Sequence, residues 1–249
     1  MGLTAKPGAG RTYFVADLHL TDERPAASGR FFRFLDENAT GADALYILGD
    51  LFEAWVGDDH DEQVAHDTAQ RLKALVTSGT PVYFMPGNRD FMLAERYAAR
   101  CGMTRLADPV RIDLYGVPTL LMHGDTLCTD DTSYQAFRRR VRHPLSLAVL
   151  RRLPRALRHR LARQARTGSE SAKARKPAEI MDVNDNEVVR VLREQQASRL
   201  IHGHTHRPAR HVHAVDGHDR ERWVVPDWYA RWGYVVCDAA GCALKVDDL

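Results

Sequence analysis

Five short apolar segments that each run into polar, metal-binding residue types are the feature that most constrains this chain of 249 residues. The segments are Thr12–Ala16, Ala44–Leu48, Pro81–Met85, Thr119–Met122 and Arg199–Ile201, and they lead into DLH, GD, GNRD, HGD and HGHTH. A short continuous apolar run is typical of a buried strand, and open α/β sheets bind ligands at the carboxyl ends of their strands. We therefore expect the five strand ends to converge on one site.

The residue types after these segments predict metal binding. Asp17 and His19 are two residues apart in an extended segment, so their side chains point the same way, and neutral imidazole is the commonest protein metal ligand. An isolated DxH is better explained by a turn-capping Asp and a surface His, and the other motifs each recur by chance, so only their shared position after apolar segments favours one site. The mixture of carboxylate, amide and imidazole ligands suits Mn²⁺, Fe²⁺ or Zn²⁺ better than Ca²⁺ or Mg²⁺ alone.

The chemistry expected of such a site is hydrolysis at phosphorus. Two cations about 3.5–4 Å apart need a shared ligand, and the carboxylate of Asp50 can bridge them. A cation pair lowers the pKa of a bridging water and holds the oxygens of a phosphoryl group. The natural substrates are therefore a phosphoester or a phosphoanhydride.

Composition bounds the environment of the protein. The net charge of +2 is too small to imply nucleic-acid binding by itself, and the four cysteines show no CxxC spacing, so we expect reduced thiols of a cytoplasmic protein. The segment MGLTAKPGAGR lacks the apolar core of a signal peptide, and no apolar run approaches the ~20 residues of a membrane span. Any membrane contact is expected to be peripheral.

The stretch from Thr126 to Asp182 differs from the rest because it has almost no strand pattern. We expect helices over Gln135–Val141, Leu145–Leu153 and Arg155–Gln164, a flexible loop over Thr167–Lys176, and a further helix from Pro177 through Gln195. No boundary indicates two independent domains. We therefore predict one domain over residues 1–249, with residues 126–182 inserted as a helical cap over the site.

The cap is rich in arginine, with eleven between Arg138 and Arg166, and leucines are interleaved with them. Three interpretations are open: a solvated charged face, a helical surface that rests on anionic lipid, and a nucleic-acid site. Nucleic acid is the least favoured, because the remainder of the chain is near neutral and the cap lacks interleaved aromatic residues.

The remaining patterns complete the expected fold. Helical spacing is present in Phe31–Asn38, His66–Val76 and Ala94–Arg100, and Arg111–Leu114 forms a hairpin with Thr119–Met122. After the histidine cluster, antiparallel strands are expected at Arg210–Val215, Arg222–Val225, Gly233–Cys237 and Ala243–Val246.

The set DLH, GD, GNRD, HGD and GHTH, in this order, resembles the calcineurin-like metallophosphoesterases over essentially the whole chain outside the cap. The resemblance implies a four-layer α/β/β/α sandwich with a dinuclear centre at the strand ends. Carried over motif by motif, it places Asp17, His19 and His206 on one metal and Asn88, His123 and His204 on the other, with Asp50 bridging. The implied cofactor is two Mn²⁺, with Fe²⁺, Zn²⁺ or Mg²⁺ as alternatives. His202 lies outside the carried-over set and is expected to be a buried supporting histidine.

Within that family, the segments GDLFEAWVGDD, PGNRDF, HGDTLCTDDTSYQ and IMDVN resemble members that hydrolyse the pyrophosphate of UDP-2,3-diacylglucosamine in lipid A biosynthesis. The resemblance implies attack by a metal-activated water, giving UMP and 2,3-diacylglucosamine 1-phosphate. Asp50, Arg89 and His123 would be catalytic. Many relatives have histidine where this chain has Arg89, and a guanidinium suits a phosphate leaving group that needs charge stabilisation more than protonation.

The same resemblance implies the substrate contacts and the setting of the reaction. Asn88, Arg89 and His204 would contact the substrate at the centre, and Asp131, Ser169, Lys173 and Lys176 would contact it from the cap, although Lys173 stands where a small polar residue such as Asn is expected. The expected partners are the UDP-lipid and the anionic inner-membrane surface on its cytoplasmic face, with no nucleic acid and no protein partner deducible. Two alternatives are a generic phosphodiesterase or nuclease of the same family, and a non-catalytic metal-bound scaffold whose cap binds lipid or protein.

Overall fold

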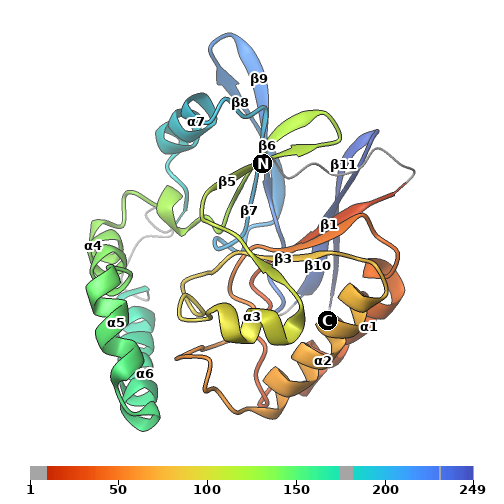
Figure 1. Cartoon of the computed structure of the whole chain (residues 1–249). Helices are drawn as coiled ribbons and strands as arrows, with labels where there is room; N and C mark the ends of the chain where they lie inside the picture. The colour runs from red at the N-terminus through yellow and green to blue at the C-terminus, as the bar shows by residue number, and fades with distance from the viewer. Residues whose placement is uncertain (1–9, 174–181, 230, 249) are drawn as a thin grey trace.

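Two β-sheets lie face to face in the computed structural model, with helices on the outer face of each (Figure 1). The structure describes residues 10–173, 182–229 and 231–248, and only the backbone of residues 169–173.

The first sheet has six strands in the order β11-β10-β1-β2-β3-β4. Its strands are β1 (Thr12–Val15), β2 (Ala44–Ile47), β3 (Val82–Phe84), β4 (Thr104–Arg105), β10 (Arg231–Asp238) and β11 (Gly241–Asp248). Strands β1 to β4 run parallel, whereas β10 and β11 are antiparallel additions at one edge. The first three predicted strands are thus confirmed as parallel neighbours whose carboxyl ends meet at one edge of the sheet.

The second sheet has five strands in the order β5-β6-β7-β9-β8. Its strands are β5 (Val110–Leu114), β6 (Val117–Met122), β7 (Arg199–His202), β8 (Ala209–Val215) and β9 (His218–Val224). The predicted hairpin β5–β6 is confirmed, and β6 pairs in parallel with β7. Strand β9 is antiparallel to β8 but parallel to β7, a mixed pairing that the expectation of antiparallel strands missed.

The apolar strand segments are buried on both faces. In β1, Tyr13 and Val15 face the helices, whereas Phe14 and the following Ala16 face the second sheet, as the two-residue period of a strand requires. In β7, Leu200 faces the helical layer that contains Val188 and Leu192, whereas Ile201 faces the first sheet. A strand buried on both faces reads as a continuous apolar run rather than an alternating one, which is why these segments stood out in the sequence.

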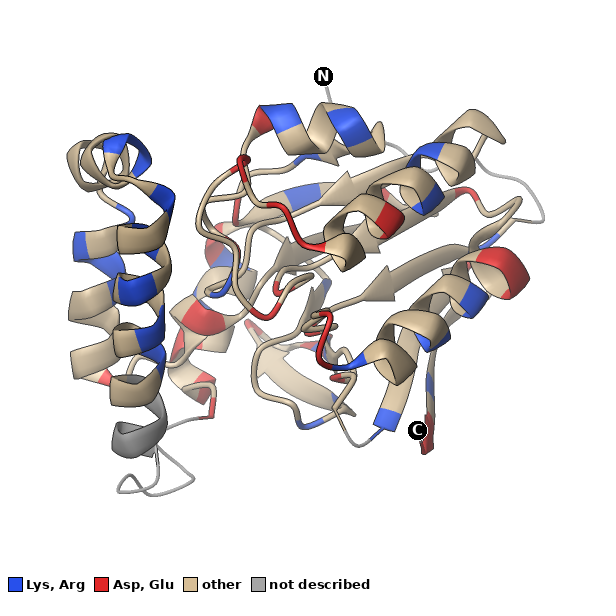
Figure 2. Ribbon diagram, turned by 90° about the horizontal axis from the view of Figure 1, so that it is seen from below, with Lys and Arg blue, Asp and Glu red and all other residues tan. Residues whose placement is uncertain are grey.

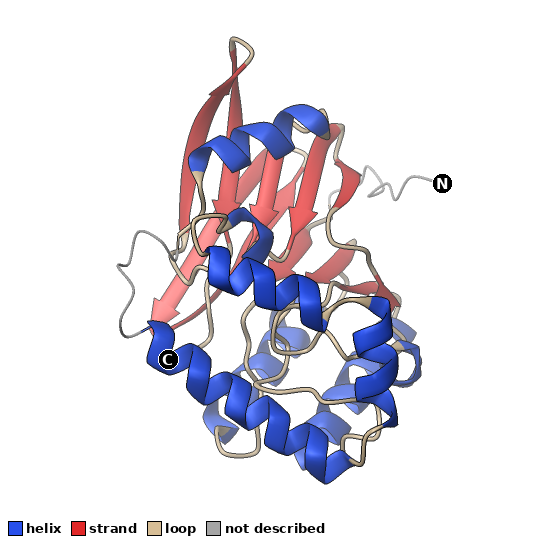
Figure 3. Ribbon diagram, turned by 90° about the vertical axis from the view of Figure 1, so that its left-hand side faces the viewer, coloured by secondary structure: helices blue, strands red, loops and turns tan. Residues whose placement is uncertain are grey.

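Helices cover both outer faces and complete four layers (Figure 3). The first sheet is covered by α1 (Pro25–Phe34), its π-helical continuation Leu35–Ala39, α2 (Gln63–Thr77) and α3 (Glu95–Cys101). Helix α7 (Asp185–Glu194) packs Val188, Val191 and Leu192 against the second sheet. The predicted α/β/β/α sandwich is therefore confirmed. Helix α1 begins earlier than expected, because Pro25 is well suited to the first turn of a helix.

A column of three helices stands beside the sandwich (Figure 1). These are α4 (Thr132–Val141), α5 (Pro144–Arg152) and α6 (Arg155–Lys173), preceded by a short 3-10 turn at Asp125–Leu127. The expected loop over Thr167–Lys176 was wrong as far as Lys173, because an existing helix is extended at low cost once it is nucleated. The expected helix start at Pro177 lies outside the described residues, and the helix that follows begins at Asp185, capped by Asn184.

Two of the four cysteines are joined, contrary to the expectation of four reduced thiols. Cys237 and Cys242 form a disulfide, whereas Cys101 and Cys128 are free and buried. The two joined residues are direct cross-strand partners in the β10–β11 hairpin. Only the strand register brings them together, and a spacing of five residues does not reveal that register.

We expect Phe34→Ala to lower the free energy of unfolding by about 3–5 kcal/mol, as for other buried Phe-to-Ala changes. The Phe34 ring is 1% exposed and contacts the rings of Tyr13, Trp228 and Tyr234. Denaturant unfolding measures the loss. Phe137→Ala is the matched control, because Phe137 is 48% exposed and its variant should lose less than 1 kcal/mol. Equal losses in the two variants would contradict this picture of the core.

Candidate metal centre

The backbone after three strands, β1, β2 and β7, is bent in the same unusual way. Asp17, His19, Asp50, His204 and His206 all have φ between 49° and 71°, although none is glycine. Eight non-glycine residues of the described chain have positive φ, so more than half of them are predicted metal ligands. Such conformations cost of order 1–3 kcal/mol each and cluster at functional sites. The strain therefore marks these strand ends as a site.

One group of ligand atoms comes from the ends of β1 and β7. Asp17, His19 and His206 each place a ligand atom within 4.8 Å of the others. Asp17 Oδ1 lies 3.9 Å from His19 Nε2 and 3.5 Å from His206 Nε2. The structure thus brings together the three residues predicted for the first metal.

A second group joins the two sheets. Asp17, Asp50 and His123 place ligand atoms within 4.8 Å of one another, and Asn88 Oδ1 lies 3.0 Å from His123 Nε2. His123 Nδ1 lies 2.9 Å from the carbonyl oxygen of Leu48, which can only accept a hydrogen bond. In the neutral ring this leaves the lone pair on Nε2, which faces the carboxylates, an arrangement typical of metal-binding histidines.

Two carboxylates have contacts in both groups. Asp50 lies 3.8 Å from His19 Nε2 through Oδ2 and 3.9 Å from His123 Nε2 through Oδ1, which suits the bridging position predicted for it. Asp17 was predicted for one metal only, yet its ligand atom belongs to both groups. Sequence spacing could not reveal this, because the second contact depends on how the sheets pack.

His204 and His202 differ in their surroundings. The His204 ring lies 5.0 Å from that of His123, centroid to centroid, but His204 belongs to neither 4.8 Å group among the described residues. His202 is fully buried, and its Nδ1 lies 2.9 Å from the carbonyl oxygen of Gly203. Burial and the charge of Arg222 lower the pKa of His202 to about 3, so its ring is neutral. His202 therefore supports the site without belonging to either group.

The electrostatics of the centre favour cations. Burial raises the pKa of Asp50 to about 7, and the nearby carboxylates of Asp90 and Asp17 add to that effect against the opposing charge of His123. Burial lowers the pKa of His123, but the carboxylates of Asp50, Asp125 and Asp17 outweigh burial and raise it to about 9. The raised pKa of His123 reports the negative potential of these carboxylates, which is the setting that binds divalent cations.

Buried polar atoms without hydrogen-bond partners, and a glycine that leaves space beside Asp50, also fit a metal. Within the described chain, Asp17 Oδ1 and both ring nitrogens of His19 are buried without a hydrogen-bond partner. An unsatisfied buried polar atom costs about 1–3 kcal/mol, and ligation by a cation removes that cost. At Gly87 an added Cβ would collide with Asp50 Oδ1, so glycine keeps this space clear. The residues present therefore fit a pair of divalent cations.

Two acidic residues hold the ligands in place. Asp90 accepts hydrogen bonds from the backbone N–H groups of Leu51 and Gly87, both at 2.7 Å, and of Asp50 at 3.3 Å. Sequence reasoning missed Glu53, although an acid in the otherwise apolar stretch Leu51–Trp55 was an available signal.

Glu53 connects a metal ligand to the cap. Its Oε2 lies 3.4 Å from His19 Nδ1 and accepts a hydrogen bond from the Tyr229 hydroxyl at 2.8 Å. Its Oε1 lies 3.2 Å from Arg166 Nη1 on α6 and 4.0 Å from Arg89 Nη1. The same carboxylate therefore lies against His19, a predicted metal ligand, against Arg89, and against Arg166 at the end of the cap.

The predicted substrate contacts of the cap are only partly described. Asp131 caps α4, because its Oδ1 accepts a hydrogen bond from the Tyr134 N–H at 3.0 Å. Ser169 and Lys173 lie on α6 with their side chains outside the description, and Lys176 lies outside the described residues. Their contacts with a substrate stay predictions.

Four of the eleven cap arginines contact residues of the sandwich rather than forming a solvated face. Arg138 and Arg142 lie 2.7 and 3.3 Å from the buried carboxylate of Asp125, and Arg142 also donates to the carbonyl oxygen of Gly87. Arg158 is 7% exposed and pairs with Asp59, whereas Arg166 reaches Glu53. These contacts fix the cap beside the strand ends.

Comparison with known proteins gives consistent matches. The family model described as calcineurin-like phosphoesterase matches residues 10–208. Relatives named UDP-2,3-diacylglucosamine hydrolase include one from Enterobacter sp. (strain 638), 48% identical over 94% of this chain and 97% of its own. Another, from Cellvibrio japonicus (strain Ueda107), is 47% identical over 96% and 99%. A solved archaeal phosphodiesterase covers 96% of this chain and 99% of its own at 12% identity, with a TM-score of 0.46.

We expect Asp50→Asn to abolish most cation-induced stabilisation while leaving the metal-free protein as stable as the wild type. The amide keeps the hydrogen bond from the Arg89 N–H, at 2.7 Å in the wild type, but removes the shared charge. With Mn²⁺ at a hundred times its Kd, the wild type should gain about 2.7 kcal/mol, and the variant less than half of that.

Thermal unfolding with and without Mn²⁺, together with equilibrium Mn²⁺ binding, measures the effect. Asp36→Asn is the matched control, because Asp36 is an exposed carboxylate that pairs with Arg71 and belongs to neither group of ligand atoms. If Asp50→Asn bound Mn²⁺ like the control, Asp50 would not be a shared ligand.

Proposed function

The chain belongs to the calcineurin-like phosphoesterase family, and from this premise we propose that it is a UDP-2,3-diacylglucosamine hydrolase. Its support is near-full-length similarity, at 47–48% identity, to curated relatives of that name. In the proposed reaction, the oxygen of water forms a bond to the phosphorus nearer uridine while the bond to the bridging oxygen breaks. The products are UMP and 2,3-diacylglucosamine 1-phosphate.

The family implies a dinuclear metal centre, and we assign two Mn²⁺ to it, with Fe²⁺, Zn²⁺ or Mg²⁺ as alternatives. When bound, the cation pair lowers the pKa of a water molecule and polarises the phosphoryl oxygens. The proposed ligands are Asp17, His19, Asp50, Asn88, His123, His204 and His206. The geometry adds one refinement, because Asp17 has contacts in both groups of ligand atoms.

Arg89 is the proposed stabiliser of the leaving group. The phosphate monoester that departs gains negative charge as the bridging bond breaks, and a planar guanidinium can match two of its oxygens. Glu53 restrains the Arg89 side chain at 4.0 Å, and the Arg89 N–H orients Asp50. One residue therefore positions a bridging carboxylate through its backbone and the product phosphate through its side chain.

The cap is proposed to hold the acyl chains and to contribute Asp131, Ser169, Lys173 and Lys176 to the substrate site. Its helices have two apolar sides. Leu147 and Leu150 pack against the core, whereas Leu145 and Val149 are 72% and 59% exposed. Each methylene removed from water contributes about 0.8 kcal/mol, so apolar residues at the cap favour a diacylated substrate.

The exposed cap face is proposed to rest on an anionic membrane surface, at the cytoplasmic face of the inner membrane. No helix within residues 10–173, 182–229 and 231–248 combines the length and the apolar character needed to cross a membrane. Exposed apolar residues on α5 and α6 lie among basic residues that dominate the charge of the three helices (Figure 2). Basic helices with an apolar face bind anionic lipid surfaces.

We expect the Mn²⁺-loaded protein to release UMP from the UDP-lipid, and chelation to abolish that release until Mn²⁺ is restored. Arg89→Ala should lower kcat by about 10²–10³ with a smaller change in KM, because its main interaction forms as charge develops. Arg71→Ala, which removes an exposed arginine paired with Asp36, is the control and should act like the wild type.

The same assay separates the alternatives. Turnover of bis-p-nitrophenyl phosphate or DNA without UMP release would assign a generic phosphodiesterase or nuclease. If the protein bound lipid but turned over no substrate, and if His123→Ala left the lipid affinity unchanged, the protein would be a non-catalytic scaffold.

We expect the double variant Leu145→Glu with Val149→Glu to bind phosphatidylglycerol vesicles at least tenfold more weakly than the wild type. Two exposed apolar side chains would be replaced by charges that the anionic surface repels. Vesicle co-sedimentation measures the loss. Val212→Glu is the control, because Val212 is 51% exposed on β8, outside the cap. Equal binding of the double variant and the control would remove this face as the contact surface.

A further inference from the structure

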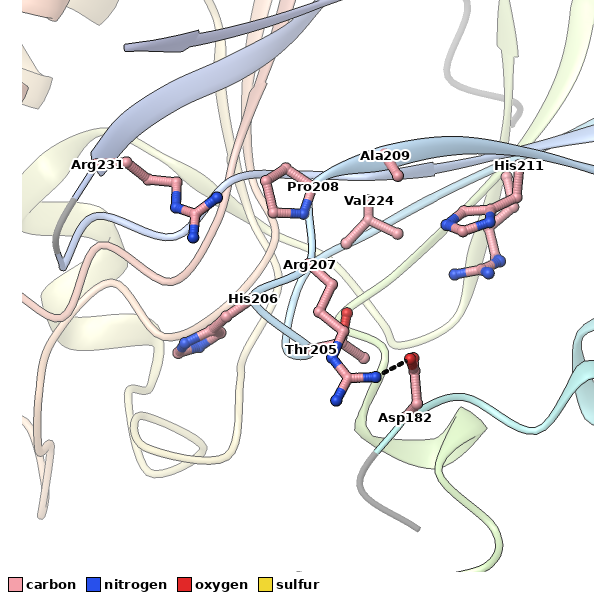
Figure 4. Close-up of a pocket in the computed structure, with 10 residues that line it drawn as sticks. Asp182, Thr205, His206, Arg207, Pro208, Ala209, His211, Val224 and Arg231 are labelled. Carbon is pink, nitrogen blue, oxygen red and sulfur yellow. Dashed lines mark hydrogen bonds and ion pairs between the residues drawn. The ribbon is translucent and has the colours of Figure 1, made fainter. Parts of the chain in front are cut away.

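A pocket adjoins the metal centre on the side of β8 and β9. Its volume is about 360 Å³, within the range of small-molecule sites. Thr205 and His206, in the loop after β7, line it and connect it to the metal centre (Figure 4). Its other lining residues are Asp182, Arg207, Pro208, Ala209, His211, Arg222, Val224 and Arg231. We call it the ribbon pocket. None of its lining residues comes from the cap helices α4, α5 or α6.

The ribbon pocket is positively charged. Three guanidinium groups line it against the single carboxylate of Asp182, which pairs with Arg207 (Figure 4). Arg231 lies 3.8 Å from Asp227 and its side chain is 43% exposed. Guanidinium groups bind phosphate through paired hydrogen bonds and also stack on planar rings. The lining therefore suits a ligand that carries both a phosphate and a flat ring.

Arg222 is the most informative residue of the ribbon pocket. It is 5% exposed, and its neighbours are imidazoles: its Nε donates to His213 Nε2 at 3.1 Å, and its Nη1 lies 3.3 Å from His202 Nε2. Among the described residues no carboxylate lies within 4.0 Å of it, and burial lowers its pKa. A buried cation without a contacting acid is costly, and an anionic ligand would offset that cost.

An unsatisfied hydroxyl also points to a ligand. Thr205 Oγ1 is buried and has no hydrogen-bond partner within the described chain. Thr205 immediately precedes His206, a proposed metal ligand, so a molecule bound in the ribbon pocket would lie beside the metal centre.

The two halves of the substrate differ in chemistry, and so do the two flanks of the centre. The cap carries exposed leucines on one flank, whereas the ribbon pocket is cationic and polar on another. Resting on the proposed function, we propose that the ribbon pocket binds the nucleotide half of the substrate, a pyrimidine nucleoside monophosphate. Arg222 and Arg231 bind its phosphate or stack on its base, and Thr205 and Asp182 bind its ribose hydroxyls.

The test is equilibrium binding of UMP, by calorimetry, to the full chain loaded with Mn²⁺. Arg231→Ala, at a partly exposed position, should raise the Kd of UMP at least tenfold, which is the loss of one charge-assisted hydrogen bond. The Kd of 2,3-diacylglucosamine 1-phosphate should change less than twofold. Arg210→Ala is the matched control, because Arg210 is a neighbouring exposed arginine on β8 that pairs with Glu221 outside the ribbon pocket.

Thr205→Val is the second variant, since it keeps the side-chain shape and removes only the hydroxyl. Unchanged UMP affinity in both variants would overturn the assignment, as would an equal loss for the lipid monophosphate. Inorganic phosphate and uridine serve as further probes: a loss for phosphate equal to that for UMP, with no binding of uridine, would reduce the ribbon pocket to a phosphate site and reject its nucleoside role. These outcomes are distinct from failure of the proposed function, which would appear as no UMP release by the wild type.

Discussion

The carboxylate of Asp17 joins the two sheets, and the rest of the site depends on that junction. Asp17 ends β1 in the first sheet, yet its Oδ2 accepts a hydrogen bond from the His204 N–H after β7 in the second, at 2.7 Å. In the reverse direction, His123 after β6 lies 2.9 Å from the Leu48 carbonyl oxygen after β2. Contacts that align the sheets are thus made by the ligand residues themselves. A cation that bound only the aligned state would therefore stabilise the fold.

Buried negative charge is the cost of this arrangement. Asp17, Asp50 and Asp90 are nearly or fully buried at adjacent strand ends, and water does not solvate them. Backbone N–H groups satisfy part of their hydrogen-bonding capacity, and histidines supply part of the opposing charge. The remaining imbalance explains why the centre suits divalent cations, and why strained left-handed backbone persists at five of its residues.

The arginines of the cap fall into two functional sets. One set, which includes Arg142, Arg158 and Arg166, bonds to residues of the sandwich and fixes where the cap stands. The other set is exposed, apart from the half-buried Arg155. Arg166 is the informative member, because its partner Glu53 also contacts His19. The cap and His19, a predicted metal ligand, are therefore linked through one carboxylate.

The sequence by itself determined which segments form the central strands, because burial on both faces produces continuous apolar runs. It also determined the types of candidate ligand, because the motifs directly follow those strands. It did not determine that Asp17 has contacts in both groups of ligand atoms, that Glu53 lies beside His19, that Arg222 lines the ribbon pocket, or that Cys237 faces Cys242. Each of these depends on strand register, sheet packing or a contact between distant segments. Local patterns report the environment of a residue along its own strand, whereas partners across the fold are decided only when the chain is packed.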